Sequence, residues 1–262
     1  MFEINDVDFD LRKIADSGQV FRITEENGIW TVLSADKICR AIIEGNCCTI
    51  RCSTEDDSYW KHYFDIENDY KAYRDSVDEN DGFLKAAVEH GKGIRILNQD
   101  PWEMLISFII SQRKNIPAIR SCIEKICSRW GRELEPGIYA FPTPEELTNA
   151  TLDELCECSL GYRAEYVYLA SKAVAEGTLD LSSLVLLDDD ELLGKLLSLK
   201  GVGIKVANCV LLFGFHRIGA FPVDVWIDRV QKEYYGGHFP IEKYEGYAGV
   251  MQQYIFYYAR TL

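Results

Sequence analysis

The segment at residues 197–209, Leu-Ser-Leu-Lys-Gly-Val-Gly-Ile-Lys-Val-Ala-Asn-Cys, constrains the fold more than any other part of the chain. Apolar residues at helical spacing on both sides of Gly201 and Gly203 predict two helices joined by a tight hairpin. Glycine at both positions lets the backbone turn sharply and leaves bare amides at the start of the second helix. With the helix dipole, these amides form a site for an anion the size of a phosphate. A Gly-x-Gly pair alone also fits an ordinary helical hairpin.

Two further residues give this hairpin a chemical interpretation. Lys205 lies in the first turn of the predicted second helix, and Asp224 follows in Phe-Pro-Val-Asp-Val at residues 221–225. A partly buried lysine at a helix start can serve as a nucleophile toward an electrophilic carbon. Asp224 is expected to cap the next helix, and its carboxylate could stabilise an oxocarbenium-like transition state. Taken alone, Lys205 could be a solvated lysine and Asp224 a helix-capping aspartate. Their combination after the hairpin favours a catalytic role for both.

Two regions of the chain differ in their hydrophobic pattern. Residues 2–52 alternate between apolar and polar side chains and are interrupted by turns, which predicts an antiparallel meander with strands at residues 19–23, 28–33, 37–43 and 48–51. From about residue 59 the apolar spacing becomes helical, most clearly at residues 102–112, 119–130, 164–175, 191–199 and 204–215. We therefore predict an α+β fold, with a small antiparallel β domain at residues 1–95 and an all-helical domain at residues 96–262.

These motifs resemble the helix-hairpin-helix, Gly-Pro-Asp (HhH-GPD) superfamily of base-excision DNA glycosylases, and within it the 8-oxoguanine DNA glycosylase/lyases. The superfamily pattern lies at residues 201–205 and 222–224. Further matches to the 8-oxoguanine branch follow in the expected order: Ser-Gly-Gln-Val-Phe-Arg at 17–22, Gln-Asp-Pro-Trp-Glu at 99–103, Leu-Gly-Tyr-Arg-Ala at 160–164, and the stretch from Ala248 to Phe256. The resemblance covers nearly the whole chain.

The resemblance implies a bifunctional enzyme, a DNA N-glycosylase and abasic-site lyase. Lys205 would attack C1′ of the deoxyribose, expel the base and form a Schiff base, after which β-elimination nicks the strand. Asp224 would support that attack. No cofactor is implied, and the implied partner is double-stranded DNA that contains 8-oxoguanine or an abasic site, bound by a monomer.

The resemblance also implies how the extruded base is recognised. Gly18 would offer its carbonyl to the N7 hydrogen that distinguishes 8-oxoguanine from guanine, and Gln252 would bind the Watson–Crick edge through its amide. Phe256, four residues later on the same helix face, would stack on the base. Cys209, one turn after Lys205, would contact the base from the other side.

A third set of residues is expected to bind the DNA around the lesion. Tyr162 resembles the residue that fills the gap left by the extruded base, although a tyrosine between Gly161 and Arg163 could also anchor its loop on the core. The other expected DNA contacts are Arg163, Arg113, Asn115, Gly201 and Gly203.

Three positions depart from the family pattern. Arg113 stands where an asparagine is expected, Ala118 where the animal branch has an arginine, and Trp226 where a phosphate-binding histidine is common. The resemblance implies that the stretch containing Arg113 contacts the base opposite the lesion, so these departures lead us to predict relaxed recognition of that base.

Net charge and cysteine content limit the partners and metals that the protein is expected to bind. The net charge of −14 by itself favours a function other than DNA binding, so the DNA interpretation depends on a local basic surface. Cys39, Cys47, Cys48 and Cys52 lack the paired spacing of a zinc site, and no cysteine follows Cys209, which excludes the iron–sulfur relatives. We therefore expect no metal.

Acidic residues at the N-terminus argue against a signal peptide, and the short apolar runs argue against a membrane span. The expected location is cytoplasmic, at the nucleoid in a prokaryote, or nuclear in a eukaryote.

Two other functions remain open. A glycosylase of the same fold could act on alkylated bases, although monofunctional members usually lack a lysine at the position of Lys205. A non-catalytic HhH module could bind DNA alone, or a scaffold could use the acidic surface to bind proteins. Phosphate binding alone requires none of Gly18, Gln252 and Phe256.

Overall fold

The computed structural model describes residues 1–6, 8–45 and 47–262. By their contacts these residues form two compact units. The first unit contains Met1–Thr31, Cys39–Asn98 and His216–Leu262, and the second contains Val32–Ile38 and Gln99–Phe215. The two units are defined by contacts between residues. They do not test the domain boundary expected between residues 95 and 96, which stays a prediction.

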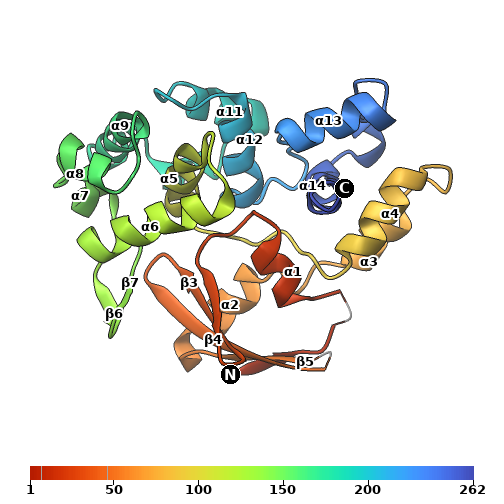
Figure 1. Cartoon of the computed structure of the whole chain (residues 1–262), viewed down its shortest axis with the longest axis horizontal. Helices are drawn as coiled ribbons and strands as arrows, with labels where there is room; N and C mark the ends of the chain where they lie inside the picture. Colours follow the sequence, from red (N-terminus) through yellow and green to blue (C-terminus); the bar gives the residue numbers. More distant parts are fainter. Residues whose placement is uncertain (7, 46) are drawn as a thin grey trace. The chain divides into compact units, whose positions relative to one another are not determined.

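The N-terminal strands form one five-stranded sheet in the order β1-β5-β4-β3-β2 (Figure 1). They are β1 (Phe2–Ile4), β2 (Ile23–Glu26), β3 (Ile29–Ser34), β4 (Lys37–Glu44) and β5 (Cys47–Arg51). Strand β5 pairs antiparallel with both β1 and β4, so that Ile50 lies opposite Phe2 on one side and Ala41 on the other. Asn27 and Gly28 join β2 to β3 with φ angles of 53° and 82°, as a two-residue hairpin turn requires. The predicted antiparallel sheet is confirmed.

The strand predicted at residues 19–23 is wrong, because β2 begins only at Ile23. Three polar residues in and next to this segment are buried: Ser17, Gln19 and Arg22. The Gln19 amide nitrogen donates to the Ser17 hydroxyl and to the Arg95 carbonyl, and its oxygen accepts from the Leu97 amide. These hydrogen bonds hold the segment as a turn between helix α1 (Leu11–Asp16) and β2.

The helices of the first unit come from both ends of its chain (Figure 1). They are α1, α2 (Asp57–Tyr63), α3 (Tyr70–Asp75), α4 (Gly82–Gly91), α13 (Val225–Tyr234) and α14 (Ala248–Ala259), with short 3-10 helices at Thr54–Asp56 and Ile241–Tyr244. Helix α14 is buried along most of its length and packs on α4 and α13. At Gly91, an added Cβ would lie 2.6 Å from the Tyr254 ring, so glycine permits the close approach of α4 and α14.

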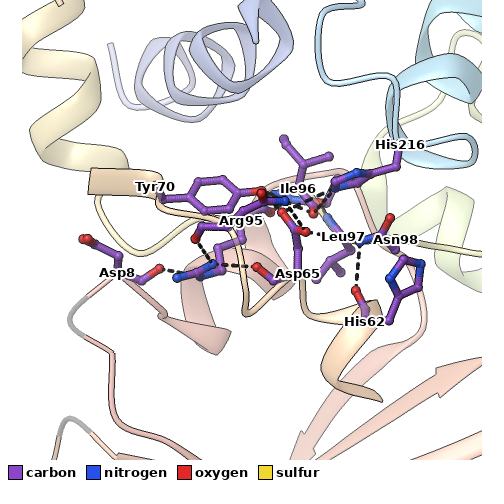
Figure 2. Close-up of polar contacts among 11 residues, drawn as sticks. Asp8, His62, Asp65, Tyr70, Arg95, Ile96, Leu97, Asn98 and His216 are labelled. Carbon is purple, nitrogen blue, oxygen red and sulfur yellow. Dashed lines mark hydrogen bonds and ion pairs between the residues drawn. The ribbon is translucent and has the colours of Figure 1, made fainter. Parts of the chain in front are cut away.

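A buried arginine organises the polar interior of the first unit (Figure 2). The Arg95 Nε donates to the Asp8 carbonyl at 2.9 Å, and Nη1 donates to the carbonyls of Asp65 and Asn68 at 2.7 and 3.0 Å. The ring of Tyr70 lies 4.6 Å from the guanidinium carbon. Nη2 pairs with the Asp6 carboxylate. One carboxylate and three carbonyls therefore satisfy this buried cation, as a buried charge requires.

The Asp65 carboxylate in the same cluster is also fully engaged. It accepts hydrogen bonds from the Tyr70 hydroxyl and the Asn68 amide, both at 2.7 Å, and lies 3.5 Å from Nε2 of His216. Burial alone would raise its pKa, but the contacts with His216, Tyr70 and Asn68 outweigh burial and lower the pKa below its usual value. The His216 ring also forms a hydrogen bond with the Ile96 carbonyl at 3.1 Å, so the cluster joins His216 to Asp65 and Ile96, which lie on either side of α3 and α4 in sequence (Figure 2).

The second unit is helical. Its elements are α5 (Pro101–Ser111), α6 (Ile116–Trp130), α7 (Pro144–Leu147), α8 (Leu152–Glu157), α9 (Arg163–Ala175), α10 (Leu181–Leu184), α11 (Asp189–Leu197) and α12 (Ile204–Phe213). Helix α5 is buried from Trp102 to Ile110 and packs on α6, α9 and α12, which makes it the centre of this core. The loop predicted around Pro136-Gly137 contains a small hairpin of β6 (Glu133–Glu135) and β7 (Ile138–Tyr139). None of the helices formed by the described residues is long and apolar enough to cross a bilayer.

Candidate active site

The predicted helical hairpin is present between α11 and α12. Gly203 is the N-cap residue of α12, is exposed, and leaves the helix without a side-chain cap. The first amides of a helix have no partner within it, so these amides are available to an anion at the positive end of the helix.

The two glycines of the hairpin serve different physical needs. Gly201 has φ +86°, and an added Cβ would lie 2.3 Å from the ring of Tyr166. An added Cβ at Gly203 would meet no atom within 4 Å. Gly201 is therefore required by the packing of the protein itself, whereas a side chain at Gly203 would cover only the open helix start.

Lys205 is the second residue of α12 and is half-buried. Its Nζ lies 5.3 Å from the centroid of the Phe108 ring, which is buried in α5 and stacked on Phe213. This contact places the amine against the face of a buried ring near the start of α12. Cys209 is buried one turn later on the same helix, as the spacing predicted.

In the first unit, Asp224 caps helix α13. Its Oδ1 accepts from the amides of Trp226 and Ile227, both at 3.0 Å, which confirms the predicted N-cap. Hydrogen bonds from two backbone amides favour the ionised carboxylate and fix its direction.

Helix α14 holds the loop that leads to Asp224. The Gln252 Nε2 donates to the Pro222 carbonyl at 3.0 Å, and the side chain is only 4% exposed. Its Oε1 is buried and has no hydrogen-bond partner among the described residues. Leaving a buried acceptor unpaired costs about 1–3 kcal/mol, so this oxygen can gain free energy from a donor on a ligand. Phe256 follows one turn later, half-buried, with the Arg260 guanidinium carbon 5.5 Å from its ring centroid.

The same helix holds the segment that contains Gly18. Gln253 donates through Nε2 to the Ser17 carbonyl at 2.6 Å, and Gly18 adopts a φ of +80°. Consecutive glutamines of α14 thus contact the residue before Gly18 and the proline two residues before Asp224. Within the first unit, the structure connects Gly18, Asp224 and Gln252 through one buried helix.

The predicted site residues are divided between the units. Lys205 and Cys209 belong to the second unit, whereas Gly18, Asp224, Gln252 and Phe256 belong to the first. The structure supports their local geometry, and their joint action on one nucleotide stays a prediction.

The residues expected to contact DNA differ in exposure. Tyr162 is 50% exposed, whereas Arg163 is only 7% exposed. The Arg163 Nε donates to the Gln112 carbonyl at 2.8 Å and Nη1 donates to the Leu160 carbonyl at 3.1 Å. The Arg163 guanidinium therefore binds the main chain of the protein, and a direct contact with DNA stays a prediction.

The turn between α5 and α6 presents Arg113. This residue is exposed and has a φ of +52°. The neighbouring Lys114 donates to the Ser159 carbonyl at 2.9 Å, and the Asn115 side chain caps α6 by accepting from the Ala118 amide at 3.0 Å. Arg113 is thus the cationic side chain that this turn extends toward solvent.

Sequence reasoning missed Gln112 and Gln253. The signal was present for Gln253, since two glutamines interrupt the apolar run at residues 250–255 of a buried helix. For Gln112 no comparable signal exists, because its partner Gly201 is distant in sequence. The described residues contain no group of three or more histidine, cysteine or acidic side chains placed to hold a metal ion.

Two family models match consecutive parts of the chain. Residues 1–105 match the 8-oxoguanine DNA glycosylase, N-terminal domain, and residues 106–244 match the HhH-GPD superfamily base excision DNA repair protein. The chain belongs to the HhH-GPD superfamily, in its 8-oxoguanine DNA glycosylase branch. The family fold, a small antiparallel sheet followed by helices, agrees with the structure described above.

Named relatives are similar over most of this chain. An N-glycosylase/DNA lyase of Saccharomyces cerevisiae is 36% identical over 203 residues, which cover 70% of this chain and 53% of the yeast protein. The chain thus spans about half the length of that relative. A probable N-glycosylase/DNA lyase of Methanothermobacter thermautotrophicus is 31% identical over 75% of this chain and 71% of the relative.

Solved structures match this chain over nearly its whole length, and one of them includes an 8-oxoguanine duplex. It is a Clostridium acetobutylicum 8-oxoguanine glycosylase/lyase in complex with double-stranded DNA containing cytosine opposite 8-oxoguanine. The TM-score is 0.90 at 36% sequence identity, and the match covers 97% of this chain and 92% of the other. A 3-methyladenine DNA glycosylase from Archaeoglobus fulgidus shares the fold at a TM-score of 0.79 and 21% identity.

Proposed function

We propose that this chain is a base-excision repair enzyme that removes 8-oxoguanine from double-stranded DNA and then cleaves the abasic strand. The observation that carries the proposal is the position of Lys205, a half-buried amine in the first turn of a helix that has no side-chain cap. Similarity to glycosylase/lyases over most of the chain supports the same function.

Lys205 would act as the nucleophile of both steps. Its Nζ lone pair forms a bond to C1′ of the deoxyribose while the bond from C1′ to the base breaks and the base leaves with the electron pair. The bond from C1′ to the ring oxygen O4′ then breaks, O4′ takes a proton from Nζ, and a Schiff base forms between Lys205 and C1′. Loss of a proton from C2′ then expels the 3′ phosphate by β-elimination. The Asp224 carboxylate would stabilise positive charge on the sugar during base loss.

Four residues would recognise the extruded base. Gly18 would accept from the N7 hydrogen through its carbonyl, and the unpaired Oε1 of Gln252 would accept from a donor on the Watson–Crick edge. Phe256 and Cys209 would contact the two faces of the ring. We propose that these contacts, with Tyr162 filling the gap in the duplex, operate within a monomer.

Single-turnover assays on matched duplexes test this function. Duplexes carry 8-oxoguanine, 3-methyladenine or a bare abasic site, and products are separated with and without hot alkali, which reveals abasic sites that were left uncleaved. We expect excision of 8-oxoguanine and cleavage of the strand without alkali. Excision of 3-methyladenine in preference to 8-oxoguanine would support the alkylated-base alternative, and binding without excision would support a non-catalytic module.

A further inference from the structure

The end of helix α5 is tied to the hairpin by one side chain. Gln112 is the C-cap residue of α5, and its Nε2 donates to the carbonyl of Ile109 in its own helix and to the carbonyl of Gly201 in the hairpin, both at 3.0 Å. The last carbonyls of a helix have no partner within it, so this amide satisfies one such carbonyl and one hairpin carbonyl together.

The main chain of Gln112 is tied to a second loop. Its carbonyl accepts from Nε and Nη2 of Arg163, and Nη1 of the same guanidinium donates to the Leu160 carbonyl. The Tyr162 ring lies over this guanidinium, 4.4 Å from its central carbon. One buried cation thus connects Gln112 to the loop that presents the exposed Tyr162.

Two aromatic contacts return from that loop to the hairpin. The Tyr162 and Tyr166 rings are arranged edge to face with centroids 5.8 Å apart. Tyr166 packs directly on Gly201, where even a Cβ would lie within 2.3 Å of its ring. The contacts therefore form a closed ring of five residues, in the order Gln112, Gly201, Tyr166, Tyr162 and Arg163, all within the second unit.

We propose that Gln112 and Arg163 are positioning residues that couple the hairpin to Tyr162, so that a phosphate held at the hairpin places Tyr162 for insertion into the duplex. This inference rests on the proposed function. The hydrogen bonds of the closed ring, from Gln112 to Gly201 and from Arg163 to Gln112, are part-buried, and a polar network whose members are all paired rigidifies the segments that it connects. In this proposal Arg163 affects DNA binding indirectly, because it connects the end of α5 at Gln112 to the loop that presents Tyr162.

Gln112→Met tests the coupling. Methionine has a similar length but no donor, so the carbonyls of Gly201 and Ile109 lose the amide while the Arg163 contact with the main chain persists. The matched control is Ser111→Ala, because the Ser111 hydroxyl donates to the Phe108 carbonyl in its own helix. Tyr166→Leu removes a different contact from the same closed ring of five residues, and it provides an independent variant if Gln112→Met fails to fold.

The readout is the opening of the duplex. A 2-aminopurine next to 8-oxoguanine reports unstacking in stopped-flow fluorescence, and single-turnover excision is measured in parallel. We expect Gln112→Met and Tyr162→Ala each to slow the fluorescence rise about fivefold or more, and the double variant to be about as slow as the slower single variant. Ser111→Ala should remain within about twofold of the wild type. Contacting residues that act as one unit show such non-additivity.

Two results would overturn the inference. In one, the effects of Gln112→Met and Tyr162→Ala multiply in the double variant, which shows independent roles. In the other, a folded Gln112→Met or Tyr166→Leu protein opens the duplex at the wild-type rate. A wild-type protein that neither unstacks the reporter nor excises 8-oxoguanine would instead overturn the proposed function, and this inference with it.

Discussion

The side-chain amide of Gln253 donates a hydrogen bond of 2.6 Å to the carbonyl oxygen of Ser17, whose carbonyl carbon is bonded to the nitrogen of Gly18. Both Gln253 and Ser17 are buried, and the Ser17 hydroxyl donates to the Ile14 carbonyl at 2.7 Å. The peptide that precedes Gly18 is therefore held on both sides. Gly18 has a φ of +80°, and its φ and ψ set the direction of its own carbonyl relative to that peptide.

Replacement of Gln253 by leucine should weaken recognition of 8-oxoguanine more than it weakens cleavage. The Ser17 carbonyl would lose its donor, and the Gly18 carbonyl would no longer be held toward the base. We expect the preference for 8-oxoguanine over guanine to fall about tenfold, or ~1.4 kcal/mol. Cleavage of a bare abasic site should stay within about threefold of the wild type. Single-turnover rates on duplexes that contain 8-oxoguanine, guanine or a bare abasic site measure both quantities.

Gln231→Leu is the matched control for that variant. Gln231 is also a buried glutamine of the first unit, and its Oε1 accepts from the Phe239 amide at 3.1 Å. Both substitutions leave a main-chain group unpaired, at a cost of about 1–3 kcal/mol in the free energy of unfolding. If Gln231→Leu reduced the 8-oxoguanine preference as much as Gln253→Leu, Gln253 would serve stability alone.

Phe256 offers a second test of base recognition. Stacking of a base on an aromatic side chain contributes about 1–3 kcal/mol. Phe256→Ala should therefore weaken binding to an 8-oxoguanine duplex by that amount while cleavage of an abasic site is mostly retained. Fluorescence titration and abasic-site cleavage provide the two measurements. Equal losses on both substrates would show that Phe256 only maintains the fold.

The Asp65 cluster predicts how stability depends on pH. The contacts of Asp65 with His216, Tyr70 and Asn68 lower its pKa in the folded protein despite burial. A carboxylate with a lowered folded pKa contributes stability above its unfolded pKa of about 3.9, and that contribution is lost as pH falls through the folded pKa. The melting temperature of the wild type should thus fall more steeply below about pH 4 than that of Asp65→Asn. Parallel slopes for both proteins would contradict this assignment.

Local patterns predicted the elements of the site better than their partners. The glycines at 201 and 203 predicted the start of α12, and the Pro-Val-Asp motif predicted the cap at Asp224, because hairpins and caps depend on neighbouring residues. The strand at residues 19–23 was wrong because Gln19 and Arg22 are buried by partners that sequence spacing does not identify. Arg163 was predicted to contact DNA, and its hydrogen bond to the Gln112 carbonyl was not predicted because Gln112 is distant in sequence.

Discrimination between bases opposite the lesion should be weak. A well-formed contact with the edge of a base contributes about 1–3 kcal/mol of selectivity, and Ala118 has no polar group to supply one. Arg113 is exposed on the turn between α5 and α6 and could bind either the base or a phosphate. We expect excision rates opposite C, A, G and T to differ by less than about a hundredfold, or ~2.7 kcal/mol. A stronger preference for cytosine, lost in Arg113→Ala, would make Arg113 the residue that recognises it.

The measurement that tests the central claim most directly is borohydride trapping on a duplex that contains 8-oxoguanine. Borohydride reduces a Schiff base to a stable amine, so an enzyme that uses Lys205 as its nucleophile becomes covalently attached to DNA. The wild type and Lys195→Gln, which changes an exposed lysine of α11, should both be trapped, and peptide mapping should place the adduct on Lys205. Lys205→Gln should yield no adduct. If a folded Lys205→Gln protein were trapped at the wild-type rate, Lys205 would not be the nucleophile.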